Sequence, residues 1–191
     1  MRNDITIRPE RPEYYPVIDA LVRRSFTEGT NYSDGSDIVA LIDEIRKGPY
    51  YLPELSFVAE LNGQIVGHFL FSEFPLSETP EGGFHDVKEE KVIMLAPVSV
   101  HADHFHQHIG VTMLRMGLEK VREAGYRGVN VEGDYHFYNR VGFRTSAEFD
   151  IYPTEGIPMT EPRCMMCQEM VPGALDKIHG YVVYEGIYEN A

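Results

Sequence analysis

The alternation of apolar and polar positions predicts strands in two places in the first half of the chain. Ile5 and Ile7 alternate with polar residues in a short strand that stops at Pro9. Further along, LSFVAEL and QIVGHFLF are β-rich runs separated by Asn62-Gly63, the pair favoured in a type I′ turn. We therefore predict an antiparallel hairpin there.

Helical spacing of apolar residues predicts three helices. PEYYPVIDALVRRSF and SDIVALIDEIRKG each carry one apolar face. The second should begin with Ser36 or Asp37 as N-cap and end at Gly48. A third helix over 109–123 should end at Gly125. The stripes of the first and third helices are Val17, Ile18, Leu21, Val22 and Phe26, and Ile109, Met113, Leu114, Leu118 and Val121.

The remaining segments predict further strands around one short helix. VIMLAPVSVHAD should be a strand interrupted near Pro97, because a proline cannot donate to the ladder and implies a bulge or an edge. RGVNVEG, RCMMCQEM and GYVVYEGIY are strand-like, and DYHFYNRVGF predicts a short helix capped by Asp134. Residues 75–90, rich in Pro, Gly, Ser and acid, predict a mobile loop. The resulting order indicates a mixed sheet in an α/β or α+β fold.

Length, composition and charge narrow the class of protein. The 191 residues suit one domain over 1–191, with a core over 1–150 and C-terminal strands over 151–191 completing the sheet. No apolar run reaches the roughly 18 residues of a membrane span, and MRNDITIRPERPEYY lacks the apolar region of a secretory signal, so we expect a cytoplasmic protein. The net charge of −13 disfavours nucleic acid and anionic membranes as partners and is compatible with a cationic amine.

HFHQHIGVTML can be interpreted as a metal site or as a phosphate cradle. His101, His104, His106 and His108 are four histidines in eight residues, as a zinc site could use. Three imidazoles would have to converge at roughly 2.0–2.1 Å, and neither HExxH nor a paired Cys-His spacing is nearby. The stretch is also a loop that enters a helix with a glycine at its start. We favour the phosphate cradle and expect no metal.

Cys164 and Cys167 form a C-x-x-C spacing with no second pair. On a strand, residues three apart point to opposite faces and cannot chelate one ion. We expect buried structural thiols.

The order of strand, loop, glycine, helix and strand, followed by FYNRVGF, resembles the GNAT family of N-acetyltransferases over nearly the whole chain. LAPVSVHAD looks like the fourth strand of the family, and PGALDKIHGYVVY resembles the tail of its YhbS-like branch. The resemblance implies a mixed central sheet of about six to seven strands flanked by about four helices, with the fourth and fifth strands splayed. It also implies direct attack of an amine, on a small molecule or a protein, on the thioester of acetyl-CoA.

The pyrophosphate loop of the family, [Q/R]-x-x-G-x-[G/A], falls on Phe105 to Gly110. Phe105 replaces the opening Gln or Arg, His108 replaces the first glycine, and Gly110 keeps the pattern. The loop works because backbone N–H groups and a helix N-terminus point at the diphosphate. If His108 needs a positive φ, it carries a steric cost. The resemblance implies that the cofactor is bound by Phe105, His106, Gln107, His108, Ile109, Gly110 and Val111 and by the strand residues Val98, Ser99 and Val100.

The resemblance places Tyr138 of GDYHFYNRVGF as the general acid that protonates the departing thiolate. Glu60, Glu73 and Glu132 are candidates for the general base, and water could also serve. Glu132 is preferred, since it lies at the C-terminal end of a strand, where ligands gather in open α/β sheets.

Two rival interpretations remain open. Phe105 and His108 favour a catalytically weak or inactive protein of the same fold that binds acyl-CoA or another ligand. The histidine cluster would instead favour a metal-dependent protein. In this fold the acceptor pocket is built from the first helices and variable loops, here 27–37 and 75–90, which carry no recognisable signature. A homodimer formed through the C-terminal segment is one plausible assembly.

Overall fold

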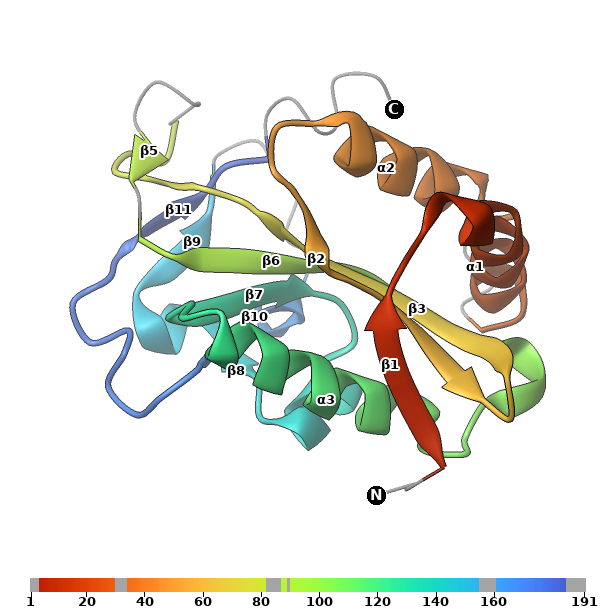
Figure 1. Ribbon diagram of the computed structural model, residues 1–191. Helices are drawn as coiled ribbons and strands as arrows, with labels where there is room; N and C mark the ends of the chain where they lie inside the picture. Colours follow the sequence, from red (N-terminus) through yellow and green to blue (C-terminus); the bar gives the residue numbers. More distant parts are fainter. Residues whose placement is uncertain (1–3, 30–33, 82–86, 89, 155–160, 185–191) are drawn as a thin grey trace.

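A computed structural model describes residues 4–29, 34–81, 87–88, 90–154 and 161–184 of the protein. Its centre is a seven-stranded mixed sheet in the order β1-β2-β3-β6-β7-β10-β8 (Figure 1). The strands are β1 (Ile5–Pro9), β2 (Tyr51–Leu61), β3 (Gln64–Glu73), β6 (Val92–Val100), β7 (Gly128–Glu132), β8 (Arg144–Thr145) and β10 (Met165–Glu169). The GNAT-like mixed sheet expected from the sequence is thus confirmed.

A second, four-stranded sheet has the order β5-β4-β11-β9. Its strands are β4 (Leu76–Ser77), β5 (Val87–Lys88), β9 (Ile151–Pro153) and β11 (Gly180–Val182). The prediction of a mobile loop over 75–90 did not foresee β4 and β5, while 82–86 and 89 lie outside the described residues. Of the C-terminal strands, β10 lies in the main sheet and β11 in the second.

Four α-helices occur in the described part of the chain: α1 (Tyr15–Gly29), α2 (Ser36–Lys47), α3 (Ile109–Glu123) and α4 (Tyr135–Tyr138). The bounds of α3 are those predicted from its apolar stripe. The N-cap of α2 is Gly35, and Asp34 Oδ1 accepts a hydrogen bond from Ser36 N at 2.9 Å, so the expected cap was wrong. Val17 was also assigned wrongly to the apolar face, since it is 50% exposed. No described helix is both long enough and apolar enough to cross a membrane.

The predicted hairpin between β2 and β3 is confirmed. Asn62 and Gly63 both have positive φ, 52° and 78°, as a type I′ turn requires. The turn pairs Leu61 with Gln64, and a β-bulge between Ala59 and Glu60 then shifts the register by one residue. Beyond the bulge Phe57 lies opposite Phe69 and Val58 opposite His68.

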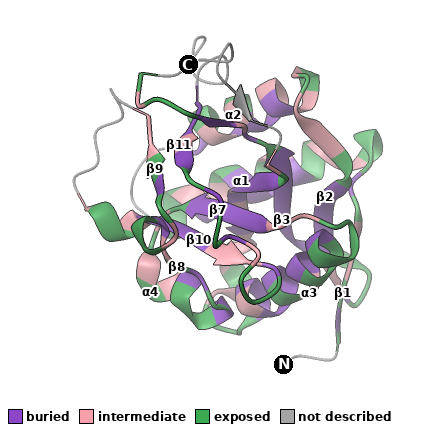
Figure 2. Cartoon of the chain, turned by 90° about the vertical axis from the view of Figure 1, so that its left-hand side faces the viewer, coloured by how far each residue is buried: buried purple, intermediate pink, exposed green. Residues whose placement is uncertain are grey.

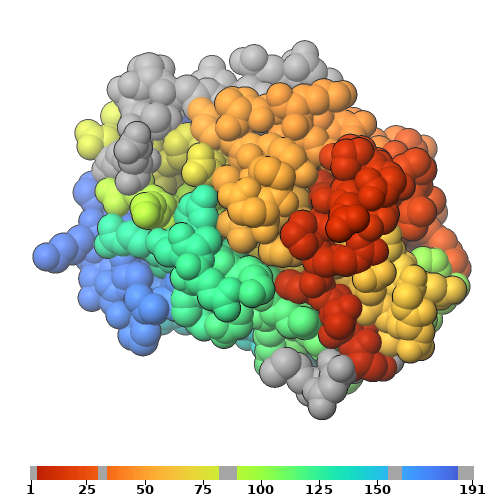
Figure 3. Space-filling view, viewed as in Figure 1, coloured from red at the N-terminus to blue at the C-terminus, as the bar shows by residue number. Residues whose placement is uncertain are grey.

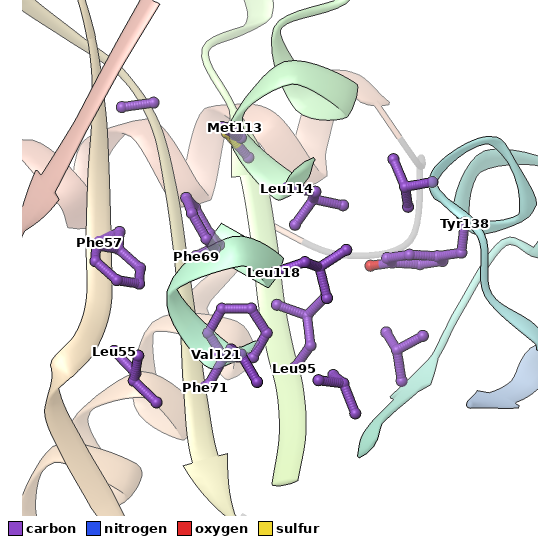
Figure 4. Packing of buried hydrophobic residues seen from close by; sticks show 14 of the residues in the cluster. Leu55, Phe57, Phe69, Phe71, Leu95, Met113, Leu114, Leu118, Val121 and Tyr138 are labelled. Carbon is purple, nitrogen blue, oxygen red and sulfur yellow. The ribbon is translucent and has the colours of Figure 1, made fainter. Parts of the chain in front are cut away.

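Two hydrophobic clusters fill the two faces of the main sheet. Phe57, Phe69 and Phe71 face α3, where they pack with Met113 and Leu118 (Figure 4). The opposite face packs against α1 and α2 through a second cluster. Figure 2 shows the central strands buried between helices that expose their outer sides. Figure 3 shows the N-terminal segments and the segments approaching the C-terminus at opposite sides of the molecule, as the strand order requires.

The parallel strands β6 and β7 pair only at their beginnings. Val92, Ile93 and Met94 pair with Gly128, Val129 and Asn130. Beyond Met94, β6 follows β3 to Val100 with a register shift between Phe69 and Phe71, opposite the segment that contains Pro97. The irregularity expected near Pro97 is thus confirmed. Beyond Met94, β6 and β7 diverge.

Candidate functional site

The divergence of β6 and β7 leaves one side of β6 without a neighbouring strand. His101 N donates to Val66 O on β3 at 2.8 Å. Because backbone groups alternate along an antiparallel pair, Val98 and Val100 direct their N–H and C=O groups away from β3, toward the divergence. Ser99 lies opposite His68, and its backbone groups face β3. The N–H of Val100 already donates to Ser25 Oγ of α1 at 3.3 Å. Val98, Ser99 and Val100 were expected to bind the cofactor. Of these, Val98 has the backbone N–H and C=O groups most directly available to a ligand in the opening between β6 and β7.

The loop after β6 leads into the N-terminus of α3. Its first 3₁₀ turn is Ala102–His104, and His108 is the N-cap of α3. The first helical hydrogen bond runs from Thr112 N to His108 O at 3.1 Å. The N–H groups of Ile109, Gly110 and Val111 thus belong to the first turn, where a helix provides no internal acceptor. Such a helix end attracts anions.

Two histidines of this loop adopt the left-handed conformation. His106 has φ of 60° and His108 has φ of 61°. This region is uncommon for residues with a Cβ, although histidine is enriched there. The positive φ considered for His108 is therefore present, with its steric cost, and the same steric cost applies to His106.

Gly110 and Phe105 of the loop have separate packing roles. A Cβ on Gly110 would lie 3.0 Å from Cζ of Phe137 and 3.5 Å from Cγ2 of Val100, so glycine allows α3 to approach both β6 and α4 closely. A Cβ on Gly29, at the end of α1, would lie 3.1 Å from Cζ of Phe105. The ring of Phe105 therefore packs the loop against the C-terminal end of α1.

The histidine cluster does not converge on one point. His101 and His104 have ring centroids 5.7 Å apart, and His101 Nδ1 accepts from Asp103 N at 3.3 Å. His106 and His108 are exposed. Across the described ranges, no group of three or more His, Cys, Asp or Glu side chains is arranged to hold a metal ion.

Tyr138 is positioned by the capped turn that follows β7. Asp134 Oδ1 accepts from His136 N at 2.9 Å, which confirms the predicted cap. The ring of Tyr138 packs edge-on against Phe137 and Phe143, with centroids 5.0 and 5.7 Å away. Its hydroxyl points inward, toward the side of Leu118 (Figure 4). Burial, with a smaller effect of the Asp134 carboxylate, raises the pKa of Tyr138 above its ordinary range, so the phenol keeps its proton at neutral pH.

Glu132 is the last residue of β7 and lies opposite Met165 of β10. Val129 and Val131 face α3, so Glu132 points to the other face of the sheet. The residue is exposed, yet partial desolvation of its carboxyl raises its pKa above the usual range. Glu60, in contrast, is held by Arg8 through bonds of 2.6 and 2.8 Å.

The two cysteines differ in environment. Cys167 is fully buried in β10, and burial raises the pKa of its thiol to about 12. Cys164 ends a 3₁₀ turn and is only partly buried, so the expectation of two buried thiols is confirmed only for Cys167.

A buried polar cluster was missed in the sequence. Glu10 follows β1, and its side chain is fully buried. Its carboxylate accepts hydrogen bonds from Arg46 Nη2 at 2.8 Å and from Tyr51 Oη at 2.8 Å, and its Oε2 lies 2.9 Å from His68 Nε2. These residues come from four segments, so no local pattern joins them. The one sequence signal is His68 within the apolar run QIVGHFLF.

Comparisons with known proteins agree with this geometry. The model of the acetyltransferase (GNAT) family matches residues 18–143. The uncharacterized N-acetyltransferase YhbS of Escherichia coli K12 is 32% identical over 149 residues, which cover 76% of this chain and 77% of YhbS. The crystal structure of E. coli YhbS in complex with CoA superposes with a TM-score of 0.77 at 27% identity, covering 97% of this chain and 92% of that one. A GNAT acetyltransferase from Brucella melitensis in complex with acetyl-CoA gives 0.70 at 26% identity, covering 98% and 100%.

Proposed function

The chain belongs to the acetyltransferase (GNAT) family, and on that premise we propose that it transfers the acetyl group of acetyl-CoA to an amine of a small molecule or a protein. The observation that carries the proposal is the continuity of two features. The opening between β6 and β7 leads along Val98 to the amide groups at the start of α3. An elongated molecule with a thioester at one end and a diphosphate at the other matches this arrangement. The CoA and acetyl-CoA bound by the two structural relatives support the same assignment.

Each chain segment then has a chemical role. The loop residues from Phe105 to Val111 bind the diphosphate through backbone amides, and the N–H of Val98 stabilises the oxyanion that forms on the thioester carbonyl. One such donor contributes about 3–4 kcal/mol to transition-state stabilisation in well-studied enzymes. Ser99 and Val100 extend the wall of the cleft.

Two side chains act as general base and general acid in this proposal. Glu132 takes the proton from the incoming ammonium group, because a carboxyl with a raised pKa is a better base than an ordinary one. Tyr138 gives its proton to the departing thiolate, because its buried phenol is protonated at neutral pH.

The experiment is thermal unfolding with and without acetyl-CoA, followed by a CoA-release assay with a panel of primary amines. Acetyl-CoA at 100 times its Kd should raise the free energy of unfolding by about 2.7 kcal/mol. Stabilisation with CoA release on adding an amine supports the proposal. An unchanged midpoint and no release would overturn it.

A protein of the same fold that holds acyl-CoA without turnover is the second candidate. His106 and His108, both in the left-handed conformation, favour this second candidate, because their side chains limit how closely a diphosphate can approach the loop backbone. Stabilisation by acetyl-CoA without CoA release for any amine would identify this candidate.

Three broader assignments complete the proposal. We place the protein in the cytoplasm as a single catalytic domain over 1–191, with the net charge of −13 favouring cationic amines over nucleic acid. A homodimer through the C-terminal segment remains one assembly to test by size-exclusion chromatography with light scattering.

A further inference from the structure

Unsatisfied buried polar atoms gather on the sheet face that α1 and α2 cover. Six buried side-chain atoms there have no hydrogen-bond partner within the described part of the chain. They belong to Asp19, His68, Ser72, Ser99 and Asn130. Buried polar groups in folded proteins are almost always paired, so these atoms are expected to bond to water or to a bound molecule.

The sheet register places these side chains beside the opening between β6 and β7. Ser72 lies opposite Met94, and Met94 lies opposite Asn130 at the last β6–β7 pair. His68 lies opposite Ser99, further along β6 where β7 has already diverged. Phe69 and Phe71 face α3, so His68 and Ser72 point to the α1/α2 face.

Glu10 determines which nitrogen of His68 can accept a proton. An ionised carboxylate only accepts hydrogen bonds, so the contact of 2.9 Å between Glu10 Oε2 and His68 Nε2 requires the proton to be on Nε2. Nδ1 of the neutral ring then keeps its lone pair. Nδ1 is buried and has no partner among the described residues. An imidazole oriented by a carboxylate, with its other nitrogen free, is the usual arrangement of a general base.

The surroundings keep Glu10 charged and His68 neutral. Burial alone would raise the pKa of Glu10, but the hydrogen bonds from His68 and Arg46 lower it to about 2. Burial lowers the pKa of His68, and the hydrogen bond to Glu10 offsets only part of that effect. The other charged or titratable groups here are Arg46 of α2, Asp19 of α1 and Tyr51 of β2, with Tyr15 of α1 beside Arg46.

We propose that His68 is the proton acceptor for the amine as its nitrogen bonds to the acetyl carbon, with Ser99 as the link to the cleft and Glu10 as the positioning residue. The inference rests on the proposed acetyl transfer. Directly opposed residues of an antiparallel pair have Cβ atoms about 4.5–5.5 Å apart, and a hydroxyl can accept one proton while donating another.

The reaction releases two protons from the nitrogen, and His68 would accept the second. An ammonium group loses one proton before attack, and Glu132 takes it in the proposed function. As the N–C bond forms and the C–S bond breaks, the nitrogen loses another. That proton passes through Ser99 Oγ and a bridging water molecule to His68 Nδ1, while Tyr138 supplies the proton that the thiolate takes. His68 then returns its proton to solvent, and Tyr138 regains one from solvent.

If the cluster of Glu10, Arg46, Tyr51 and His68 were only structural, its polar atoms would all be paired. Glu10 is fully bonded by Arg46, Tyr51 and Nε2 of His68, so stability alone does not require Nδ1 to stay unpaired. Stability also does not require the hydroxyl of Ser99, directly opposite His68 on β6, to stay unpaired. The two atoms lie on the same face of the sheet without bonding to each other, so a bridging water molecule would link them when the proton moves.

The test compares His68→Gln with wild type, using the best amine from the CoA-release panel. A glutamine amide can still donate to Glu10 from the position of Nε2, but it has no titrating Nδ1. We expect kcat to fall about 100-fold or more, with KM for acetyl-CoA changed less than about twofold. The acidic limb of the kcat/KM profile should change shape, because the loss of the free Nδ1 lone pair as pH falls no longer contributes and only the protonation of Glu132 remains. An unchanged kcat with an unchanged limb would overturn the proposal.

Ser56→Ala is the matched control, because Ser56 is a buried serine on the same face whose Oγ donates to Leu52 O at 3.0 Å. It should keep the wild-type rate, whereas Ser99→Ala should lose rate. All variants should keep the thermal stabilisation by acetyl-CoA. Wild type that shows neither stabilisation nor release refutes the proposed function rather than the role of His68.

A second measurement does not depend on the acceptor. Nitrogen NMR of labelled histidine in the full-length protein, assigned with His68→Gln, reports which ring nitrogen is protonated. We expect the proton on Nε2 and an unprotonated Nδ1 at neutral pH. A proton on Nδ1 would overturn the proposal whatever the turnover.

Discussion

At the scale of single residues, the aromatic setting of Tyr138 makes its hydroxyl separable from its ring. Tyr138→Phe keeps the packing against Phe137 and Phe143 and removes only the proposed acid. We expect kcat to fall about 10²-fold while the Kd for acetyl-CoA stays within about twofold, measured by steady-state kinetics and calorimetry. Tyr135→Phe on the same helix is the control and should retain activity. Equal rates for the two variants would remove Tyr138 from the mechanism.

His108 tests whether a left-handed histidine limits cofactor binding. His108→Gly relieves a steric cost of roughly 1 kcal/mol but gives the unfolded chain more freedom, so the free energy of unfolding should change by less than about 1 kcal/mol. The affinity for acetyl-CoA should rise, because the backbone becomes more accessible. Gln107→Gly, at a neighbouring position without a positive φ, should bring no gain. A loss of affinity in His108→Gly would instead mean that the imidazole itself contacts the diphosphate.

At the scale of elements, α3 depends on a glycine to approach the sheet. A Cβ on Gly117 would overlap the ring of Phe69 and lie 3.2 Å from Cε2 of Phe71. Gly117→Ala should lower the free energy of unfolding by about 1–3 kcal/mol despite the better helix propensity of alanine, as urea denaturation would measure. Glu119→Ala, exposed on the same helix, should change it by no more than roughly 0.5 kcal/mol. A stabilised Gly117→Ala protein would contradict this packing.

Elements with a strong local pattern were predictable from the sequence. The bounds of α3 follow from its apolar stripe, and the β2–β3 turn follows from Asn62-Gly63. β4, β5 and β11 have only two or three residues each, too few for any periodicity, and their pairing joins distant segments. The cluster of Glu10 and His68 was not predictable for the same reason, since it depends on which segments the fold brings together.

At the scale of the whole molecule, the buried carboxylate of Glu10 makes stability depend on pH. Its pKa is lowered from 4.5 to about 2, so its contribution is present above about pH 4.5 and is lost as the pH falls toward 2. Glu10→Gln should lower the free energy of unfolding by about 3 kcal/mol at pH 7, because buried Arg46 loses its buried partner and keeps only the partly exposed Asp43 at 3.2 Å.

Urea unfolding at pH 7 and pH 3 would measure both effects. Wild type should lose stability between these values, and Glu10→Gln should lose less. Glu60→Gln, which breaks a partly exposed pair with Arg8, is the control and should cost no more than about 1 kcal/mol. Parallel pH curves for wild type and Glu10→Gln would contradict this assignment.

The short contact between β6 and β7 also has a mechanical consequence. The half of the main sheet formed by β1, β2, β3 and β6 is joined to the half formed by β7, β10 and β8 through three residue pairs along the strands. A slender junction of this kind bends more easily than a full ladder. A ligand that hydrogen-bonds to Val98 adds a rung where the ladder stops, as an added strand does in other proteins. Occupancy of the cleft would therefore stiffen the molecule across its middle and hold the two walls at a fixed separation while the reaction proceeds.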